Sequence, residues 1–510
     1  MKLFTAAQIR DWDALTIKAE PVSSLDLMER AASALTDWLL QQYREGRTEL
    51  FPRPALTVCF CGMGNNGGDG LVVARLLHQA GWPVQVVVVR HSEKASADFK
   101  ANLDRFESLG DVHWIEKAAP VFPKIPPDSL VLDALLGTGL SRPASGILAE
   151  TIGKINQSNA TVVAVDIASG LFAEAPNGPD DPIVRPAYTV SFQRPKLAFL
   201  QPKLAEFVGE WRVLDIGLSD EFDQKTQTPF FLTDEAEIRR IQQPRSRFSH
   251  KGSYGHALLL AGSFGKIGAA LLAARACLRS GVGLLTVQVP GCGYSILQTA
   301  VPEAMCLTDP DERTHTTVPD LAPYQSVGVG PGLGKDEKTA AFLEELLEKA
   351  GKAKVPLVLD ADALNLLSED KTLLKKLPPD SLLTPHPKEF ERLAGTWAND
   401  YEKLELLRDF CQKYRCVVTL KGAYTAVGIP TGVSTRGEVH FNTTGNPGMA
   451  TGGTGDVLTG VLTALRAQGY GAAEAAKFGV FQHGLAGDRV VAKRGFSTLV
   501  AGELVEQLGW

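Results

Sequence analysis

Short apolar blocks alternate with amphipathic stretches along most of the first half of the chain. The apolar blocks are strand-sized and lie at 55–62, 84–90, 129–137, 160–170 and 188–192. Stretches with helical spacing, such as LVVARLLHQAG at 71–81, separate them. This alternation is typical of a parallel sheet with helices on both faces, so we predict a three-layer α/β domain here.

The same alternation begins a second time after a polar interval. Residues 217–247 show no sustained strand pattern and look like a junction. The later apolar blocks are HALLLAGS, GLLTVQVP, SVGVGPG, VPLVLDADAL, SLLTPHP and CVVTLKG. A chain of 510 residues also exceeds what one hydrophobic core usually supports. We therefore predict two tandem α/β domains, residues 1–222 and residues 223–510.

Composition and charge narrow the classes of partner. The net charge is -6 and no basic run interrupts the chain, so nucleic acid is not an expected partner. The longest apolar stretches are far shorter than the ~20 residues of a spanning helix, and the N-terminal stretch turns polar too early for a signal peptide. We expect a cytoplasmic protein without membrane contact. The seven cysteines show no Cys-x-x-Cys spacing, and Cys59 and Cys61 are expected to pack in the core.

A glycine-rich turn, GMGNNGGDG at 62–70, joins an apolar block to a helical stretch. Its amides are expected at a helix N-terminus on the carboxyl edge of the sheet, where anions and nucleotides bind. A tight turn capped by Asp69 explains this stretch equally well when it is taken alone. Two more apolar blocks end in an aspartate followed by small residues, Asp133 in DALLGTGL and Asp166 in VDIASG.

The carboxyl ends of neighbouring parallel strands meet at one edge, so these polar side chains are expected to converge there. The side chains are those of Asn65, Asn66, Asp69, Asp133, Asp166 and Ser169. Amide, carboxylate and hydroxyl oxygens are hard ligands that suit an alkali or alkaline-earth ion rather than zinc.

A second glycine-rich loop, TTGNPGMATGGTGDVLTG, starts at residue 443 and runs directly into a helix. The amides of Gly453, Thr454 and Gly455, together with the helix dipole, form an anion hole suited to a phosphoryl group in transfer. Asp456 follows in the first turn, where a carboxylate can take the proton of an attacking hydroxyl. Capping alone requires neither the long loop nor this order of residues.

The motifs GNNGGDG, DALLGTGL and VDIASG together resemble the epimerase domain of NAD(P)H-hydrate repair enzymes, over roughly residues 1–220. The resemblance implies a Rossmann-like fold, acid-base work by Asp166, and a potassium ion held by Asn66, Asp133 and Ser169. Ala168 stands where the commoner motif has proline, which leaves the liganding positions in place. The implied contacts to the hydrated dinucleotide are Asn65, Asn66, Gly67, Gly68, Asp69, Gly137, Thr138, Gly139, Leu140, Ser141, Arg142, Pro143 and Asp166.

The second half resembles the ribokinase-like, ADP- or ATP-dependent NAD(P)H-hydrate dehydratases over about 245–510. The motifs are HKGSYGHALLLAGS, GVGPGLG, DADALNLL, TPHPKEF, KGAYT and GNPGMATGGTGDVLTG. The implied nucleotide contacts are Lys421, Gly422, Ala423, Tyr424, Thr425 and Gly455. The implied contacts to the hydrated dinucleotide are Gly332, His386, Asp456 and either Ala269 or Ala270. Taken alone, His386 is also consistent with a capping or core histidine, and His483 is interpreted as a satisfied interior histidine.

Taken together, the two halves resemble the bifunctional NAD(P)H-hydrate repair enzymes. This implies that both epimers of hydrated NADH and NADPH (NADHX and NADPHX) are substrates, and that the protein is a homo-oligomer. It also implies ADP or ATP as co-substrate and Mg²⁺ at the dehydratase site, with Asp360, Asp362 or Glu389 as candidates to orient the Mg²⁺.

Two alternatives stay open on the sequence alone. The second half is also compatible with a ribokinase-like small-molecule kinase of the hydroxymethylpyrimidine or pyridoxal type, although NPGMATGGTGD and PHPKEF favour the dehydratases. The first half is also compatible with a non-catalytic nucleotide-binding module.

Overall fold

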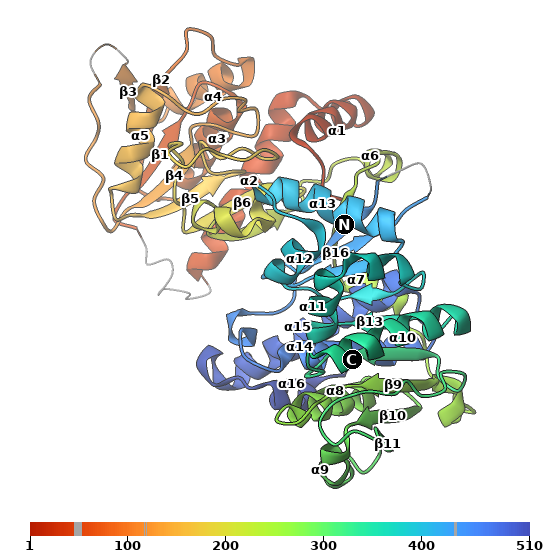
Figure 1. Ribbon diagram of the computed structural model, residues 1–510. Coiled ribbons are helices and arrows are strands. Elements are labelled where there is room, and N and C mark those ends of the chain that lie inside the picture. The colour runs from red at the N-terminus through yellow and green to blue at the C-terminus, as the bar shows by residue number, and fades with distance from the viewer. Residues whose placement is uncertain (45–53, 117, 119, 433–435, 510) are drawn as a thin grey trace. The chain divides into compact units, whose positions relative to one another are not determined.

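The computed structural model describes residues 1–44, 54–116, 118, 120–432 and 436–509. Two compact units are present, one of residues 2–228 and one of residues 229–510 together with Met1. Each unit combines a sheet with helices (Figure 1), so the prediction of two tandem α/β domains is confirmed. Residues 223–228, which were expected in the second domain, group with the first unit.

The first unit contains a seven-stranded parallel sheet with the order β3-β2-β1-β4-β5-β6-β7. The chain order reverses between β1 and β4, which creates the crevice at the carboxyl edge where ligands of such sheets bind. The strands are β1 Thr57–Cys61, β2 Val84–Arg90, β3 Val112–Glu116, β4 Leu130–Ala134, β5 Thr161–Val165, β6 Tyr188–Phe192 and β7 Glu210–Leu214. The sequence did not predict β3 and β7, because these edge strands are half-exposed and lack an apolar block.

Alternate residues of these strands pack on opposite faces of the sheet. Cys59 and Cys61 lie in one core cluster, whereas Val58 and Phe60 lie in the other. The predicted core packing of the two cysteines is therefore confirmed. The helices of this unit are α1 Ala6–Ala19, α2 Ser24–Arg44, α3 Asn65–Gln79, α4 Ala97–Glu107, α5 Ile147–Asn156 and α6 Asp220–Lys225.

The second unit contains a ten-stranded sheet with the order β11-β10-β9-β12-β13-β14-β15-β16-β17-β8. All neighbours are parallel except those of β16. The strands are β8 Phe230–Thr233, β9 His256–Leu260, β10 Leu284–Val289, β11 Met305–Thr308, β12 Ser326–Val329, β13 Leu357–Leu359, β14 Leu382–Leu383, β15 Val417–Leu420, β16 Ala426–Ile429 and β17 Glu438–Asn442. The interval 217–247 was interpreted as a junction without strands, and this was wrong, since β8 pairs with β17 there.

One helix pair of the second unit is packed unusually closely. A Cβ atom on Gly460, in the middle of α14, would lie 2.1 Å from the carbonyl oxygen of Ala273 on α8. Only glycine permits this approach. The α-helices of this unit are α7 Glu235–Ile241, α8 Ile267–Arg279, α9 Tyr294–Ala300, α10 Glu337–Ala353, α11 Ala361–Glu369, α12 Pro387–Ala394, α13 Asp400–Tyr414, α14 Thr454–Ala467, α15 Ala472–Arg494 and α16 Ala501–Gln507.

Short 3₁₀ turns complete both units, at Leu197–Leu200, Pro202–Phe207, Lys251–Tyr254, Gly291–Gly293, Lys371–Lys376, Pro447–Met449 and Phe496–Thr498. Among the described residues, no helix combines the length and the apolar character that a membrane span requires.

Candidate active sites

The first unit holds a cavity of about 590 Å³ at the carboxyl edge of its sheet, with α1 and α2 forming walls. The predicted substrate residues that line it are Asn65, Asn66, Asp69, Gly137, Thr138, Gly139, Leu140 and Asp166. Gly67, Gly68, Ser141, Arg142 and Pro143 are not among the lining residues. A Cβ atom on Gly67 would collide with the carbonyl of Gly62, and one on Gly68 would press on the end of the Met28 side chain.

Asp166 lies at the end of β5 in a left-handed conformation with φ of +65°. Its Oδ1 atom accepts hydrogen bonds from Lys196 Nζ at 2.7 Å, Ser191 Oγ at 3.0 Å and the Phe192 amide at 3.2 Å. The Lys196 side chain is only 3% exposed, so this is a buried ion pair. Lys196 was not predicted from the sequence, although the polar QRPK that follows the strand YTVSF carries the same strand-end signal as the other motifs.

Two further carboxyl groups line this cavity. Burial raises the pKa of Asp13 to about 6, and the charge of Asp166 adds to this effect. Burial also raises the pKa of Asp69 well above its usual range, with smaller contributions from Asp166 and Asp13. The cavity therefore combines an ion-paired carboxylate with carboxyl groups that hold their protons to higher pH, the arrangement that separates acid from base roles.

The three residues predicted to hold potassium come together around the turn that follows β4. Asp133 is fully buried and accepts hydrogen bonds from Ser169 Oγ at 2.5 Å and the Ser169 amide at 2.8 Å. Asn66 Nδ2 donates to the Leu136 carbonyl at 3.1 Å, and Ser169 Oγ accepts from the Leu136 amide at 2.8 Å. Burial raises the pKa of Asp133 to about 6, so a cation beside it would relieve the cost of its charge.

In the second unit, Asp456 stands in the first turn of α14, directly after the loop residue Gly453 with φ of +91°. Burial raises the pKa of Asp456 to about 6, and the charge of Asp360 raises it further while Lys421 opposes the shift. Gly455 lies beside both partners, because a Cβ atom there would be 3.5 Å from Asp360 Oδ2 and 3.6 Å from Lys421 Nζ. The glycine-rich turn therefore places a basic carboxylate next to a lysine.

Asp360 organises this site from the end of β13. Lys421 Nζ donates to Asp360 Oδ1 at 2.9 Å, and Thr459 Oγ1 on α14 donates to Asp360 Oδ2 at 2.9 Å. Burial would raise the pKa of Asp360, yet Lys421 and these hydrogen bonds hold it below its usual value. Burial would likewise lower the pKa of Lys421, but Asp360 and Glu389 raise it. Lys421, predicted to contact nucleotide, is thus fixed by an ion pair.

Among the predicted dinucleotide contacts of the second unit, Gly332 and Ala269 lie next to each other, whereas His386 lies apart and caps helix α12. A Cβ atom on Gly332 would lie 3.1 Å from Ala269 Cβ, whereas Ala270 is buried in the core. Of the two alanines, Ala269 is therefore the one beside Gly332. His386 caps α12, with Nδ1 accepting from the amides of Lys388 and Glu389, and its side chain remains 45% exposed.

The other predicted residues of this unit lie in loops around the same edge. Gly422, Ala423, Tyr424 and Thr425 form the turn between β15 and β16. His483 is buried as expected, but its Nε2 atom has no hydrogen-bond partner among the described residues, so it is not fully satisfied.

Asp488 on α15 is a further residue that the sequence analysis did not find. It accepts from the amide of Gly445 at 3.0 Å and from Asn446 Nδ2 at 2.8 Å, and so anchors the glycine-rich loop. A helical aspartate far along the chain from the loop gives no local sequence signal.

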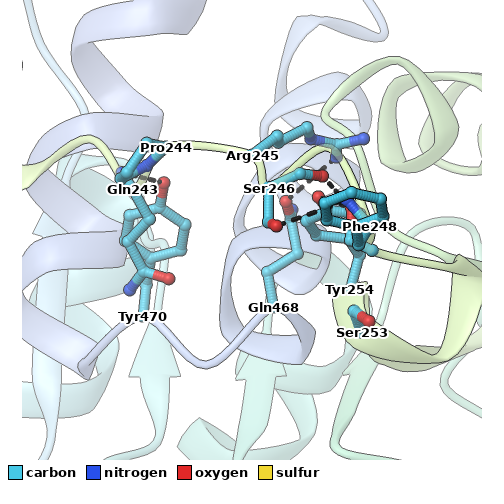
Figure 2. Close-up of a pocket in the computed structure, with 10 residues that line it drawn as sticks. Gln243, Pro244, Arg245, Ser246, Phe248, Ser253, Tyr254, Gln468 and Tyr470 are labelled. Carbon is cyan, nitrogen blue, oxygen red and sulfur yellow. Dashed lines mark hydrogen bonds between the residues drawn. The ribbon is translucent and has the colours of Figure 1, made fainter.

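A separate pocket of about 380 Å³ lies at the far end of α14 (Figure 2). Arg245 stacks over the Tyr254 ring at 4.0 Å, and the Gln243 amide donates to the Tyr470 hydroxyl at 3.0 Å. Gln468, at the end of α14, also lines this pocket. Gln468 comes twelve positions after Asp456, which corresponds to roughly 18 Å along the helix axis. This pocket is therefore distinct from the site around Asp456.

Comparisons with known proteins match each unit separately and the chain as a whole. Residues 24–198 match the model of the YjeF-related protein N-terminus, and residues 257–508 match the model of NAD(P)H-hydrate dehydratase. A bifunctional NAD(P)H-hydrate repair enzyme of Moorella thermoacetica is 35% identical over 100% of this chain and 96% of its own length. The chain belongs to the family of bifunctional NAD(P)H-hydrate repair enzymes.

Other members of this repair family show the same extent of similarity. The Coxiella burnetii enzyme is 35% identical over 99% of this chain and 98% of its own length. Among solved structures, the ADP/ATP-dependent NAD(P)H-hydrate dehydratase of Bacillus subtilis, co-crystallized with ATP/Mg²⁺, is 30% identical with a TM-score of 0.46. It covers 55% of this chain and 96% of that chain. The family resemblance predicted from the motifs of both halves is confirmed by the full-length relatives.

Proposed function

We propose that this chain repairs damaged nicotinamide cofactors with two activities. The first unit epimerises the R and S forms of NADHX and NADPHX. The second unit dehydrates the S form to NADH or NADPH and converts ADP or ATP to AMP or ADP and phosphate. The observation that carries the proposal is that each unit has its own carboxyl-edge site and its own family match.

In the second unit, the chemistry converts a poor leaving group into a good one. The hydroxyl at C6 of the hydrated ring leaves slowly as hydroxide. Asp456, with its pKa raised to about 6, takes the hydroxyl proton while the amides around Gly453 and Gly455 hold the terminal phosphate. The oxygen is phosphorylated, and the lone pair of the ring nitrogen then expels phosphate to give a C6=N iminium. Loss of the C5 proton to the departing phosphate forms the C5=C6 bond and restores the dihydropyridine.

The residues around Asp456 divide into two groups in this proposal. Lys421 to Thr425 and Gly455 contact the adenine nucleotide, with Lys421 supplying positive charge beside the phosphates. Gly332, Ala269 and His386 contact the hydrated dinucleotide. The spatial support is the proximity of Ala269 to Gly332 and of Gly455 to Lys421.

Magnesium fits the oxygen donors at this edge. Mg²⁺ is usually held by one or two carboxylates together with substrate phosphates. Asp362 is partly exposed, pairs with Lys266 at 3.2 Å, and its charge raises the pKa of the base Asp456, so Asp362 is the candidate donor beside that base. Asp360 is less suited because Lys421 and Thr459 already bind both of its oxygens. When bound, the ion would neutralise phosphate charge.

Potassium fits the cluster of Asn66, Asp133 and Ser169 in the first unit. Hard oxygen donors gather there around a buried carboxylate whose pKa is raised by burial. When bound, the ion would supply positive charge beside residues 136–140, which line the cavity. Asp166 is the acid-base group that meets the substrate in the same cavity. A homo-oligomer in the cytoplasm completes the proposal.

The test measures recovery of reduced-nicotinamide absorbance from a mixture of both NADPHX epimers. The full chain is supplied with ADP or ATP, Mg²⁺ and K⁺. Recovery of the whole pool faster than spontaneous epimerisation supports both activities. Recovery that stops once the S form is used up would contradict the epimerase activity. If no absorbance recovers and the protein instead phosphorylates a vitamin-like alcohol, the second unit is a small-molecule kinase.

A further inference from the structure

The cavity of the first unit has a carboxyl group on a wall that no motif of the sequence identified. Helix α1 contributes Ile9, Arg10, Asp13, Ala14 and Ile17 to the lining. Ile9, Asp13 and Ile17 follow one another at intervals of four residues and therefore share one face of the helix. Asp13 is the carboxyl-bearing residue on that face, between two apolar neighbours.

Asp166 reaches the same cavity from a different wall, at the carboxyl end of β5. Asp69 also comes from the sheet edge, near the start of α3, and is partly exposed. Asp13 and Asp166 thus line one cavity from two different elements, α1 and the end of β5, and the charge of Asp166 acts on Asp13.

Several charged and titratable groups surround Asp13 in this cavity. Arg10 on α1, Asp69 on α3, His91 after β2, and Asp166 with Lys196 at the sheet edge all line the cavity. Burial raises the pKa of Asp13 to about 6 and Asp166 adds to this, while Lys196 opposes it. Lys196 is bound to Asp166 at 2.7 Å, so the ammonium stabilises the charge of Asp166 first.

We propose that Asp13 and Asp166 form a two-sided acid-base pair for the epimerisation at C6, an inference that rests on the proposed epimerase function. The Asp13 carboxyl protonates the departing hydroxyl, the C6–O bond breaks, and the ring-nitrogen lone pair forms a C6=N bond as water leaves. Asp166 then takes a proton from a water that adds to the opposite face, and a new C6–O bond forms.

The step is balanced without any outside reagent. One water leaves, one water adds, and one proton passes from Asp13 to the outgoing oxygen while another passes from the incoming oxygen to Asp166. Asp13 ends as a carboxylate and Asp166 ends protonated, which is the state required for the reverse epimerisation. The two epimers are thus processed by the two protonation states of one pair.

The decisive variant is Asp13→Asn in the full chain, with Asp11→Asn as the matched control, since Asp11 is exposed on the same helix. We expect Asp13→Asn to slow epimerisation of the R form by about 100-fold or more, the usual scale for losing a general acid. Dehydration of the S form should be unchanged, and Asp11→Asn should retain both activities. Asp13→Glu should restore part of the epimerase rate.

A second measurement uses the unaltered chain in ¹⁸O-labelled water. We expect one solvent oxygen at C6 for each epimerisation event above the spontaneous background. Epimerisation without label uptake overturns the water-exchange step. An Asp13→Asn variant that epimerises the R form at the wild-type rate overturns the role of Asp13. A wild-type chain that does not epimerise at all is the separate failure of the proposed function.

Discussion

The two units use the same sheet edge in opposite ways. In each unit the chain order of the strands reverses at one point, between β1 and β4 in the first and between β9 and β12 in the second. In both, a carboxylate of the candidate site follows a strand end, Asp166 after β5 and Asp360 after β13. The first unit surrounds a cavity with Asp13, Asp69 and Asp166, and one lysine pairs with Asp166. The second unit gives its buried Asp360 a lysine and a threonine hydroxyl, and leaves Asp456 beside glycine amides.

The difference between the units lies in how the charge of their buried carboxyl groups is compensated. Burial raises the pKa of a carboxyl group unless a cation or hydrogen-bond donors offset it. At Asp13, where burial is offset only in part by Lys196, the carboxyl group holds its proton to higher pH than a free aspartate does. At Asp360, Lys421 and hydrogen-bond donors outweigh burial, so a carboxylate and a lysine are fixed together beside the glycine-rich loop.

The largest effect is expected from Asp456→Asn, which separates the units by activity. Dehydration of the S form should fall by about 1,000-fold, because the amide cannot accept the hydroxyl proton. Epimerisation should be unchanged. The reciprocal Asp166→Asn should abolish epimerisation and spare dehydration. Both activities are measured with single epimers as substrates. Loss of both activities in either variant would show that the two sites are not independent.

Lys196→Met should reduce epimerisation by about 100-fold, because Asp166 loses the cation that stabilises its charge. The exposed Lys203→Met is a control of the same chemistry in the same unit. The measurement is kcat for the R form, with dehydration of the S form as the internal reference. An unchanged kcat would show that Ser191 and Phe192 alone are enough to hold Asp166.

The pH dependence of dehydration should follow Asp456. The group must be ionised to accept a proton, so kcat/KM should be steady above about pH 6 and fall about tenfold for each unit below it, as Asp456 takes up a proton. Initial rates with the S form from pH 4.5 to 8 measure this. A profile that stays flat down to pH 4.5 would contradict a base with a raised pKa.

The smallest effect is expected from Arg245→Ala in the pocket of Figure 2. This change removes the stacking on Tyr254 but lies at the other end of α14 from Asp456. We expect less than a twofold change in either activity, with at most a small decrease in melting temperature. A tenfold decrease in dehydration would show that the two ends of α14 are coupled.

Sequence patterns predicted what local physics determines. The apolar blocks at 84–90 and 188–192 became strands, with the valines at 86–89 buried in the first and all five residues buried in the second. β7 and β11 were missed because edge strands keep exposed polar positions, and β8 because only pairing with β17 makes it a strand.

The predicted site residues are those that stand at strand ends, where topology forces convergence. Asn66, Asp133 and Ser169 meet around one turn for this reason. Asp13 and Asp488 escaped notice because each belongs to a helix whose docking, rather than its own sequence, brings it to the site. Ordinary helical positions carry no local mark of such a role.

Gly460 gives the second unit an unexpected point of fragility. It lies one helical turn after Asp456, where α14 touches the backbone of α8 without any intervening side chain. A single added methyl group would push the helices apart and carry the anion hole with them, while every reacting residue kept its identity. A method that scores variants only by their distance from the substrate would therefore rate Gly460→Ala as harmless. It would miss a loss of cofactor-repair activity.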